Sequence, residues 1–157
     1  MKRIIMIFLG MILMCSLIGC SNIKPSQEST TKTTNKEDKS MNYGLVFMID
    51  SVEVNVTWED NESVTALKAL ANTGISINMS KYGGFEQVGP LDKRLPSNDT
   101  EITPSPGDIV LYSSNQIVVF YGSNTWRYTK LGHINLSKSE LTNLLGKNDV
   151  VIAISIK

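Results

Sequence analysis

The stretch LVFMIDSVEVNVTW, residues 45–58, decides the fold class, because it contains two strand-like runs joined by a short turn. In residues 52–58, apolar side chains at every second position alternate with polar ones, which is the pattern of a strand with one buried face. Asp50 and Ser51 separate the two runs and suit a hairpin turn. The stretch therefore predicts a β-hairpin at the start of a β-rich domain.

Six further strand-like runs follow, with Gly, Asn or Ser at most of the joints between them. They cover residues 75–79, 85–88, 108–112, 116–121, 126–131 and 150–156. Eight such runs in one domain favour a closed barrel or a sandwich.

Two segments carry helical signals instead. Asn61 suits an N-cap before a short apolar stripe that includes Leu67. Ser137 and Glu140 fit a capping box, and Gly146 suits the end of that helix. Helices of about ten residues are marginal unless they are packed, so we expect both to cover the open ends of the sheet structure.

The N-terminus has the pattern of a bacterial lipoprotein signal. Lys2 and Arg3 precede an apolar run, residues 4–18, that closes with LIGC, residues 17–20. We expect residues 1–19 to be removed and Cys20 to carry the lipid, which places the protein outside the cytoplasm on the bacterial cell membrane. A plain secretory signal or a short membrane anchor is the alternative, but a spanning helix needs ~20 apolar residues.

Residues 21–40 are almost wholly polar and cannot fold alone. We therefore expect residues 20–40 to form a disordered tether and residues 41–157 to form one domain. From residue 41 onward, nine basic residues stand against twelve acidic ones, a net charge of −3. An acidic domain gives no reason to expect a nucleic-acid partner.

Cysteine and histidine counts exclude several kinds of site. Cys15 lies in the leader and Cys20 begins the tail, so the domain has no thiol. His133 is the only histidine, so paired imidazoles cannot hold a transition metal. A Ser-His-Asp triad lacks its Gly-x-Ser-x-Gly elbow here. We therefore expect no catalytic residue, no metal site and no cofactor.

Two aromatic stretches, residues 80–89 and 120–128, are the best candidates for a binding site. A Gly-Gly pair in the first allows a sharp turn between two aromatic residues and a carboxylate. In the second, strand alternation places Trp126 and Tyr128 on one face and Arg127 on the other. Core and rim packing of a barrel is the alternative for both stretches; either role suits a barrel mouth. The candidate groove contains Tyr82, Phe85, Glu86, Arg94, Tyr121, Trp126, Arg127 and Tyr128, with Arg94 or Arg127 as an anion contact.

Several short motifs follow one another along residues 45–156. They are WEDNES (58–63), YGGFE (82–86) with VG (88–89), LP (95–96), PGDI (106–109) with LY (111–112), FYG (120–122) and LG (131–132). In order and spacing they resemble the small prokaryotic cyclophilin-like domain family. This resemblance implies a closed eight-stranded antiparallel β-barrel with two short capping helices.

The resemblance does not carry an activity with it. The Phe-His-Arg and Gly-Gly-Asp-Phe motifs of true cyclophilins are missing from this sequence. We expect a non-enzymatic lipoprotein domain that binds a small ligand or peptide. The alternative is a prolyl isomerase or folding factor for exported proteins, which would need an arginine facing the aromatic groove.

Overall fold

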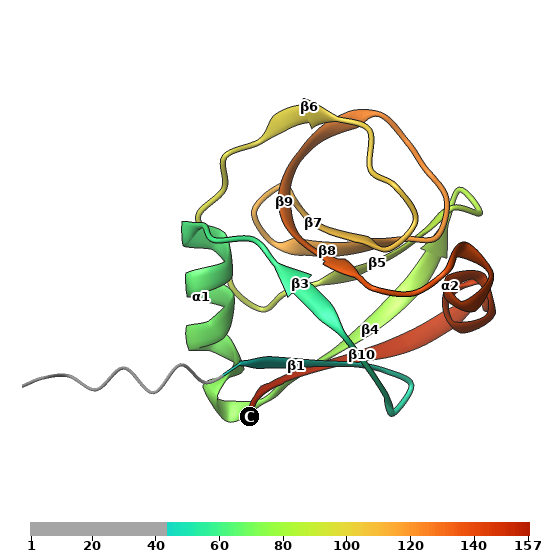
Figure 1. Ribbon diagram of the computed structural model, residues 1–157. Helices are drawn as coiled ribbons and strands as arrows, with labels where there is room; N and C mark the ends of the chain where they lie inside the picture. The colour runs from blue at the N-terminus through green and yellow to red at the C-terminus, as the bar shows by residue number, and fades with distance from the viewer. Residues whose placement is uncertain (1–43) are drawn as a thin grey trace, which may run out of the picture. The chain divides into compact units, whose positions relative to one another are not determined.

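The computed structural model describes residues 44–157. These residues form ten β-strands, two α-helices and one 3₁₀ helix (Figure 1). The signal and Cys20, with the tether up to residue 40, lie outside the described residues. Within residues 44–157, none of the helices combines the length and the apolar character that crossing a bilayer requires.

The elements follow one another through short connections, except for the long segment between β5 and β7. In chain order they are β1 (Leu45–Ile49), β2 (Val52–Val54), β3 (Val56–Trp58), α1 (Glu62–Leu70), η1 (Ala71–Thr73), β4 (Ile75–Tyr82), β5 (Glu86–Pro90), β6 (Thr100–Ile102), β7 (Asp108–Tyr112), β8 (Gln116–Phe120), β9 (Trp126–Ile134), α2 (Lys138–Leu145) and β10 (Asp149–Ile156).

The strands form a nearly closed antiparallel barrel. Their order is β2-β1-β10-β4-β5-β8-β7-β9-β3, and β6 pairs with β9 off this path. The two end strands, β2 and β3, are consecutive in sequence and only Asn55 separates them. The segment 52–58 therefore pairs with β1 through its first half and with β9 through its second half, which closes the sheet.

The barrel expected from the sequence is confirmed, with ten strands instead of eight. The predicted run 52–58 is divided at Asn55, where its backbone passes from one partner strand to the other. At this point the Asn135 N–H donates to the Asn55 carbonyl at 2.9 Å. The other additional strand, β6, has three residues and no alternating apolar pattern that could predict it.

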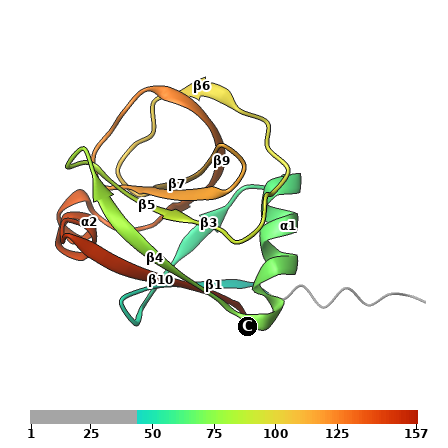
Figure 2. The same ribbon diagram turned by 180° about the vertical axis from the view of Figure 1, so that it is seen from behind.

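Both predicted helices are confirmed together with their caps. The Asn61 side chain accepts from the Val64 N–H at 3.0 Å, and Ser137 and Glu140 form the capping box of α2. Figures 1 and 2 show α1 and α2 on opposite sides of the barrel. Their buried leucines join the barrel core, which supplies the packing that helices this short need.

The predicted turn at Asp50-Ser51 is also present. Both residues have positive φ angles, 45° and 70°, as a tight two-residue hairpin requires. The Asp50 carboxylate accepts from the Val151 N–H at 2.9 Å and from Lys147 at 2.9 Å. These bonds lower the pKa of Asp50, the Val151 bond having the largest effect.

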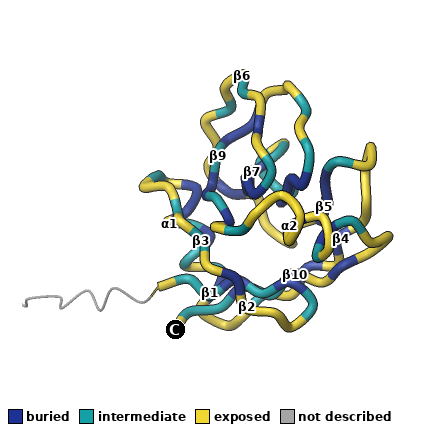
Figure 3. Tube along the Cα trace, turned by 45° about the vertical axis from the view of Figure 1, so that its right-hand side comes forward, coloured by how far each residue is buried: buried dark blue, intermediate teal, exposed yellow. Residues whose placement is uncertain are grey.

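The structure has two apolar clusters, one inside the barrel and one on its outer face. Strands β7 and β8 separate them: Ile117 and Val119 point into the barrel, whereas Val118 and Phe120 belong to the outer cluster with Tyr128. Figure 3 shows the buried stretches of β7 and β9 below the more exposed β6. Because β7 and β8 are covered on both faces, they form a rigid base for side chains that project outward from the sheet.

Candidate functional site

The aromatic groove is a hollow of about 540 Å³ on the outer face of the sheet. Its size lies within the ~300–1,000 Å³ range of ligand pockets. It is lined by Tyr82, Glu86, Val88, Tyr112, Gln116, Val118, Asn124, Trp126 and Tyr128.

Strand register brings these residues together. Tyr82 of β4 pairs with Glu86 of β5, and Val88 of β5 pairs with Val118 of β8. Val118 belongs to the outer cluster, while the residues on either side of it face the barrel interior. The groove therefore lies on the wall of the barrel and not at its mouth, where the sequence analysis placed it.

Four aromatic rings shape the groove. Tyr128 is buried, and its ring makes edge contacts with Tyr112 at 5.9 Å and with Phe120 at 5.7 Å between centroids. Tyr82 and Trp126, in contrast, are 65% and 58% exposed. Exposed large aromatic side chains gathered at one hollow are typical of interaction sites.

Glu86 is the one acidic residue in the groove lining. It is only 5% exposed, and its Oε2 atom is buried without a hydrogen-bond partner. Burial raises the pKa of Glu86 to about 7. The lining contains no lysine, arginine or histidine to compensate the charge. The groove thus holds a carboxyl group that exchanges its proton near neutral pH and lacks a partner.

The structure brings together four of the eight residues predicted for the groove: Tyr82, Glu86, Trp126 and Tyr128. The Gly-Gly turn pointed to Tyr82 and Glu86, and strand alternation pointed to Trp126 and Tyr128. Neither signal could find Tyr112 or Val118, since their presence depends on the order of β5, β8 and β7 in the sheet.

The other four predicted residues lie elsewhere. Arg127 points away and donates to the Asp99 carbonyl at 2.6 Å, as its place opposite Trp126 implied. Arg94 is exposed in the loop before Leu95 and does not line the groove.

Phe85 and Tyr121 have structural positions. The Phe85 carbonyl accepts from the Tyr121 N–H at 2.9 Å and from the Gly122 N–H at 2.8 Å, which fixes the β4–β5 turn against the end of β8. Gly83 has a φ of 59°, in the left-handed region that favours glycine, and a Cβ atom there would lie 2.2 Å from the Phe85 ring. Tyr121 packs in the barrel core.

A second buried carboxylate, Asp108, lies at the start of β7 and is 6% exposed. It contacts His133 Nδ1 at 2.8 Å and Lys130 Nζ at 3.2 Å, and it accepts from the Ser105 N–H at 2.8 Å. Burial alone would raise the pKa of Asp108, but these bonds outweigh it and hold the pKa below its ordinary value. We call Asp108, Ser105, Lys130 and His133 the Asp108 cluster.

The Asp108 cluster supplies the carboxylate that orients a histidine, which the sequence analysis did not anticipate. No serine hydroxyl among residues 44–157 bonds to His133, so the described contacts contain no triad. The same residues include no group of three His, Cys, Asp or Glu side chains placed to hold a metal ion. The cluster joins β7, β9 and the loop before β7.

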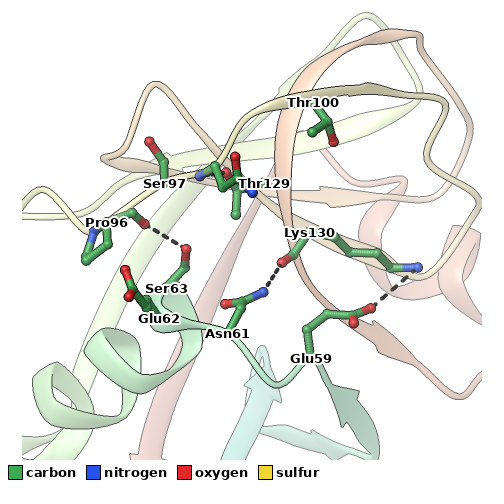
Figure 4. A pocket seen from close by; sticks show the side chains of 10 residues that line it. Glu59, Asn61, Glu62, Ser63, Pro96, Ser97, Thr100, Thr129 and Lys130 are labelled. Atoms are coloured by element: carbon green, nitrogen blue, oxygen red, sulfur yellow. Dashed lines mark hydrogen bonds and ion pairs between the residues drawn. The ribbon is translucent and has the colours of Figure 1, made fainter.

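A polar pocket lies beside the N-terminus of α1 (Figure 4). Its walls bond to each other: the Ser63 hydroxyl donates to the Pro96 carbonyl at 2.7 Å, and Asn61 Nδ2 donates to the Lys130 carbonyl at 2.9 Å. Glu59 lies 3.9 Å from Lys130. The Ser63 bond fastens α1 to the loop before β6, and the Asn61 and Glu59 contacts fasten the residues before and at its cap to β9.

The comparisons with known proteins gave one match. A family model described as the Cyclophilin-like family matches residues 47–156. No curated protein and no solved structure matches the chain. The matched residues include every residue that lines the aromatic groove.

Proposed function

This chain belongs to the cyclophilin-like family, and on this fold we propose a binding function: the aromatic groove holds a small ligand or a peptide. The observation that carries the proposal is the buried Glu86 Oε2, which has no hydrogen-bond partner. A buried polar group without a partner costs about 1–3 kcal/mol, and more when it is charged. A ligand that supplies the missing partner recovers this free energy.

The surroundings of Glu86 support the same function. The barrel elsewhere satisfies its buried acid: Asp108 has three partners. Glu86 is left open next to two exposed aromatic rings, which are costly to keep in water. Departures from good packing that occur together at one hollow are expected at functional sites.

Binding is favoured over prolyl isomerisation. Isomerisation would need an arginine facing the groove, and neither of the two arginines of the described domain is in the lining. The prolyl bond has a rotational barrier of ~20 kcal/mol, and no groove residue resembles the arginine that true cyclophilins use. We expect no acceleration of Ala-Pro isomerisation in a protease-coupled assay. Catalysis that Arg127→Ala or Arg94→Ala abolishes would reverse this choice.

A screen of the full chain in mild detergent tests the binding function. We expect small ligands or peptides to shift the nuclear magnetic resonance signals of the groove residues. Trp126→Ala should weaken binding, whereas Val151→Ala, at another exposed apolar residue outside the groove, should not. Ligand-dependent shifts confined to other surfaces would contradict the proposal.

We further propose that a lipid on Cys20 anchors this module outside the cytoplasm. The support is the LIGC sequence at residues 17–20 and the polar segment that follows it. Cys20→Ser should release the protein from membranes, as measured by fractionation after a high-salt wash. A Cys20→Ser chain that remains with the membranes would show that the lipid is not the anchor.

A further inference from the structure

The groove lining has a charge and a chemistry that select one class of ligand. Four aromatic rings, from Tyr82, Tyr112, Trp126 and Tyr128, surround a single acid, Glu86. The face of an aromatic ring is electronegative and attracts cations. Since the lining contains no basic side chain, every charged or quadrupolar element of this groove favours a positive ligand.

We propose that the aromatic groove binds a primary alkylammonium group, which donates N–H hydrogen bonds to the Glu86 carboxylate and lays its carbon chain along Val88, Val118 and the rings. This inference deepens the proposed function and rests on it. The ammonium could belong to a free amine or to a lysine side chain of a peptide, because both present the same chemistry to the groove.

Glu86 determines that the cation carries N–H groups. Its Oε2 atom is buried and unpartnered, so it is satisfied only by a hydrogen-bond donor. A quaternary ammonium satisfies the rings but leaves this oxygen without a partner. A neutral alcohol can donate to the oxygen but forms no ion pair with the carboxylate and makes no cation–π contact with the ring faces.

An anion is excluded by the same residues. It would lie against the Glu86 carboxylate and against the electronegative ring faces, and the lining offers it only neutral donors, from two amides and from the phenol and indole groups. Arg127, which could have received an anion, is held at the Asp99 carbonyl instead.

The protonation state of Glu86 makes binding depend on pH. The other titratable groups of the groove lining are Tyr82 on β4, Tyr112 on β7 and Tyr128 on β9. Burial, with the Glu86 charge second, raises the pKa of Tyr128, and the same two causes raise the pKa of Tyr121 at the end of β8. Because the pKa of Glu86 is about 7, the ligand binds the ionised form and displaces a proton near neutral pH.

The test is a titration of the full chain in detergent at constant ionic strength, at pH 8 and pH 5.5. The probes are n-butylammonium and Nα-acetyl-lysine amide, with n-butanol as the neutral isostere and tetramethylammonium as a cation without N–H groups. We expect both amines to bind at pH 8 and about 30-fold more weakly at pH 5.5, since affinity for the ionised acid falls tenfold per pH unit below its pKa.

Substitutions locate the effect. Glu86→Gln, which keeps the size of the side chain, should lower amine affinity at least tenfold at pH 8 and remove its pH dependence. Glu53→Gln, at an exposed acid of β2 outside the groove, should change neither. If the lysine amide binds more tightly than n-butylammonium, the source is a peptide; the opposite order indicates a free amine.

Four outcomes overturn the inference, and the first three of them spare the proposed function. Equal binding of n-butanol, or tighter amine binding at pH 5.5, leaves a working groove with the wrong ligand class. Tetramethylammonium binding more tightly than n-butylammonium removes the role of the Glu86 hydrogen bond. No binding of any probe at tens of millimolar rejects the alkylammonium group, and the ligand screen then decides the binding function separately.

Discussion

Glu86 and Asp108 occupy comparable places and behave in opposite ways. Each is the first residue of a strand that pairs with β8, and each is buried, at 5% and 6% exposure. Asp108 has three hydrogen-bonding partners, which hold its pKa down. Glu86 Oε2 has no partner, and burial raises the Glu86 pKa to about 7.

Burial alone therefore does not distinguish a structural acid from a functional one. The difference lies in what neighbouring residues offer each carboxylate. The Asp108 cluster uses its acid to fix β7 against β9, whereas the groove leaves its acid available. Four measurements test this distinction.

The largest effect should come from pH. Because the folded-state pKa of Glu86 is raised from 4.5 to about 7, its contribution to stability is fully present below pH 4.5 and is lost as the pH rises through 7. Between pH 4.5 and pH 8.5, the parent chain should lose about 3 kcal/mol relative to Glu86→Gln. Urea unfolding across this range measures the difference. If the unfolding free energies of the parent and Glu86→Gln chains changed in parallel with pH, burial would not raise the pKa of Glu86.

Asp108→Asn should have a smaller effect on the free energy of unfolding, and the contribution of Asp108 should depend on pH in the opposite direction to that of Glu86. The substitution weakens the bonds to Ser105, Lys130 and His133. We expect a loss of about 2 kcal/mol at pH 7, since the Lys130 and His133 side chains are partly exposed. The Asp108 contribution is present above its unfolded pKa of about 3.9 and fades as the pH falls through the lowered folded value. Asp92→Asn, at an exposed acid, is the control.

His133→Ala removes one partner of Asp108 and leaves two. The loss should be about 1 kcal/mol, the net value of a typical hydrogen bond, because the His133 side chain is 39% exposed and its ring adds little to the core. Thermal unfolding measures it. If amine binding in the groove also fell, the two sites would be coupled, which the separation of their contacts does not predict.

Tyr82→Ala should affect stability least. Its side chain is 65% exposed, so unfolding free energy should change by no more than about 0.5 kcal/mol. Ligand affinity should still fall, since the ring is part of the groove lining. A large loss of stability with unchanged binding would mean that Tyr82 stabilises the fold and does not contribute to ligand binding.

Local signals explain what the sequence predicts correctly. Caps at Asn61 and Ser137 and the turn at Asp50-Ser51 depend on residues a few positions apart, and all three are confirmed. Strand β6 was missed because the three residues Thr100–Ile102 show no period. Their strand state comes from pairing with β9, which the local sequence does not encode.

Non-local register explains what the sequence could not predict of the candidate site. The partnership of Asp108 with His133 joins residues of β7 and β9 that lie opposite each other only in the assembled sheet. Tyr112 enters the groove for a similar reason. Arg94 lies outside every predicted strand, so no alternation indicated its orientation, and it remained a candidate only as a possible anion contact.

The position of β10 has a consequence for the order in which the chain can be assembled. This strand lies between β1 and β4, and its Ile152 is paired with Ile49 on one side and with Ile77 on the other. Until residues 149–156 have been synthesised, two early strands have a gap between them and the sheet cannot close. Such distant pairings form slowly, so the barrel can close only after the C-terminal strand has been made.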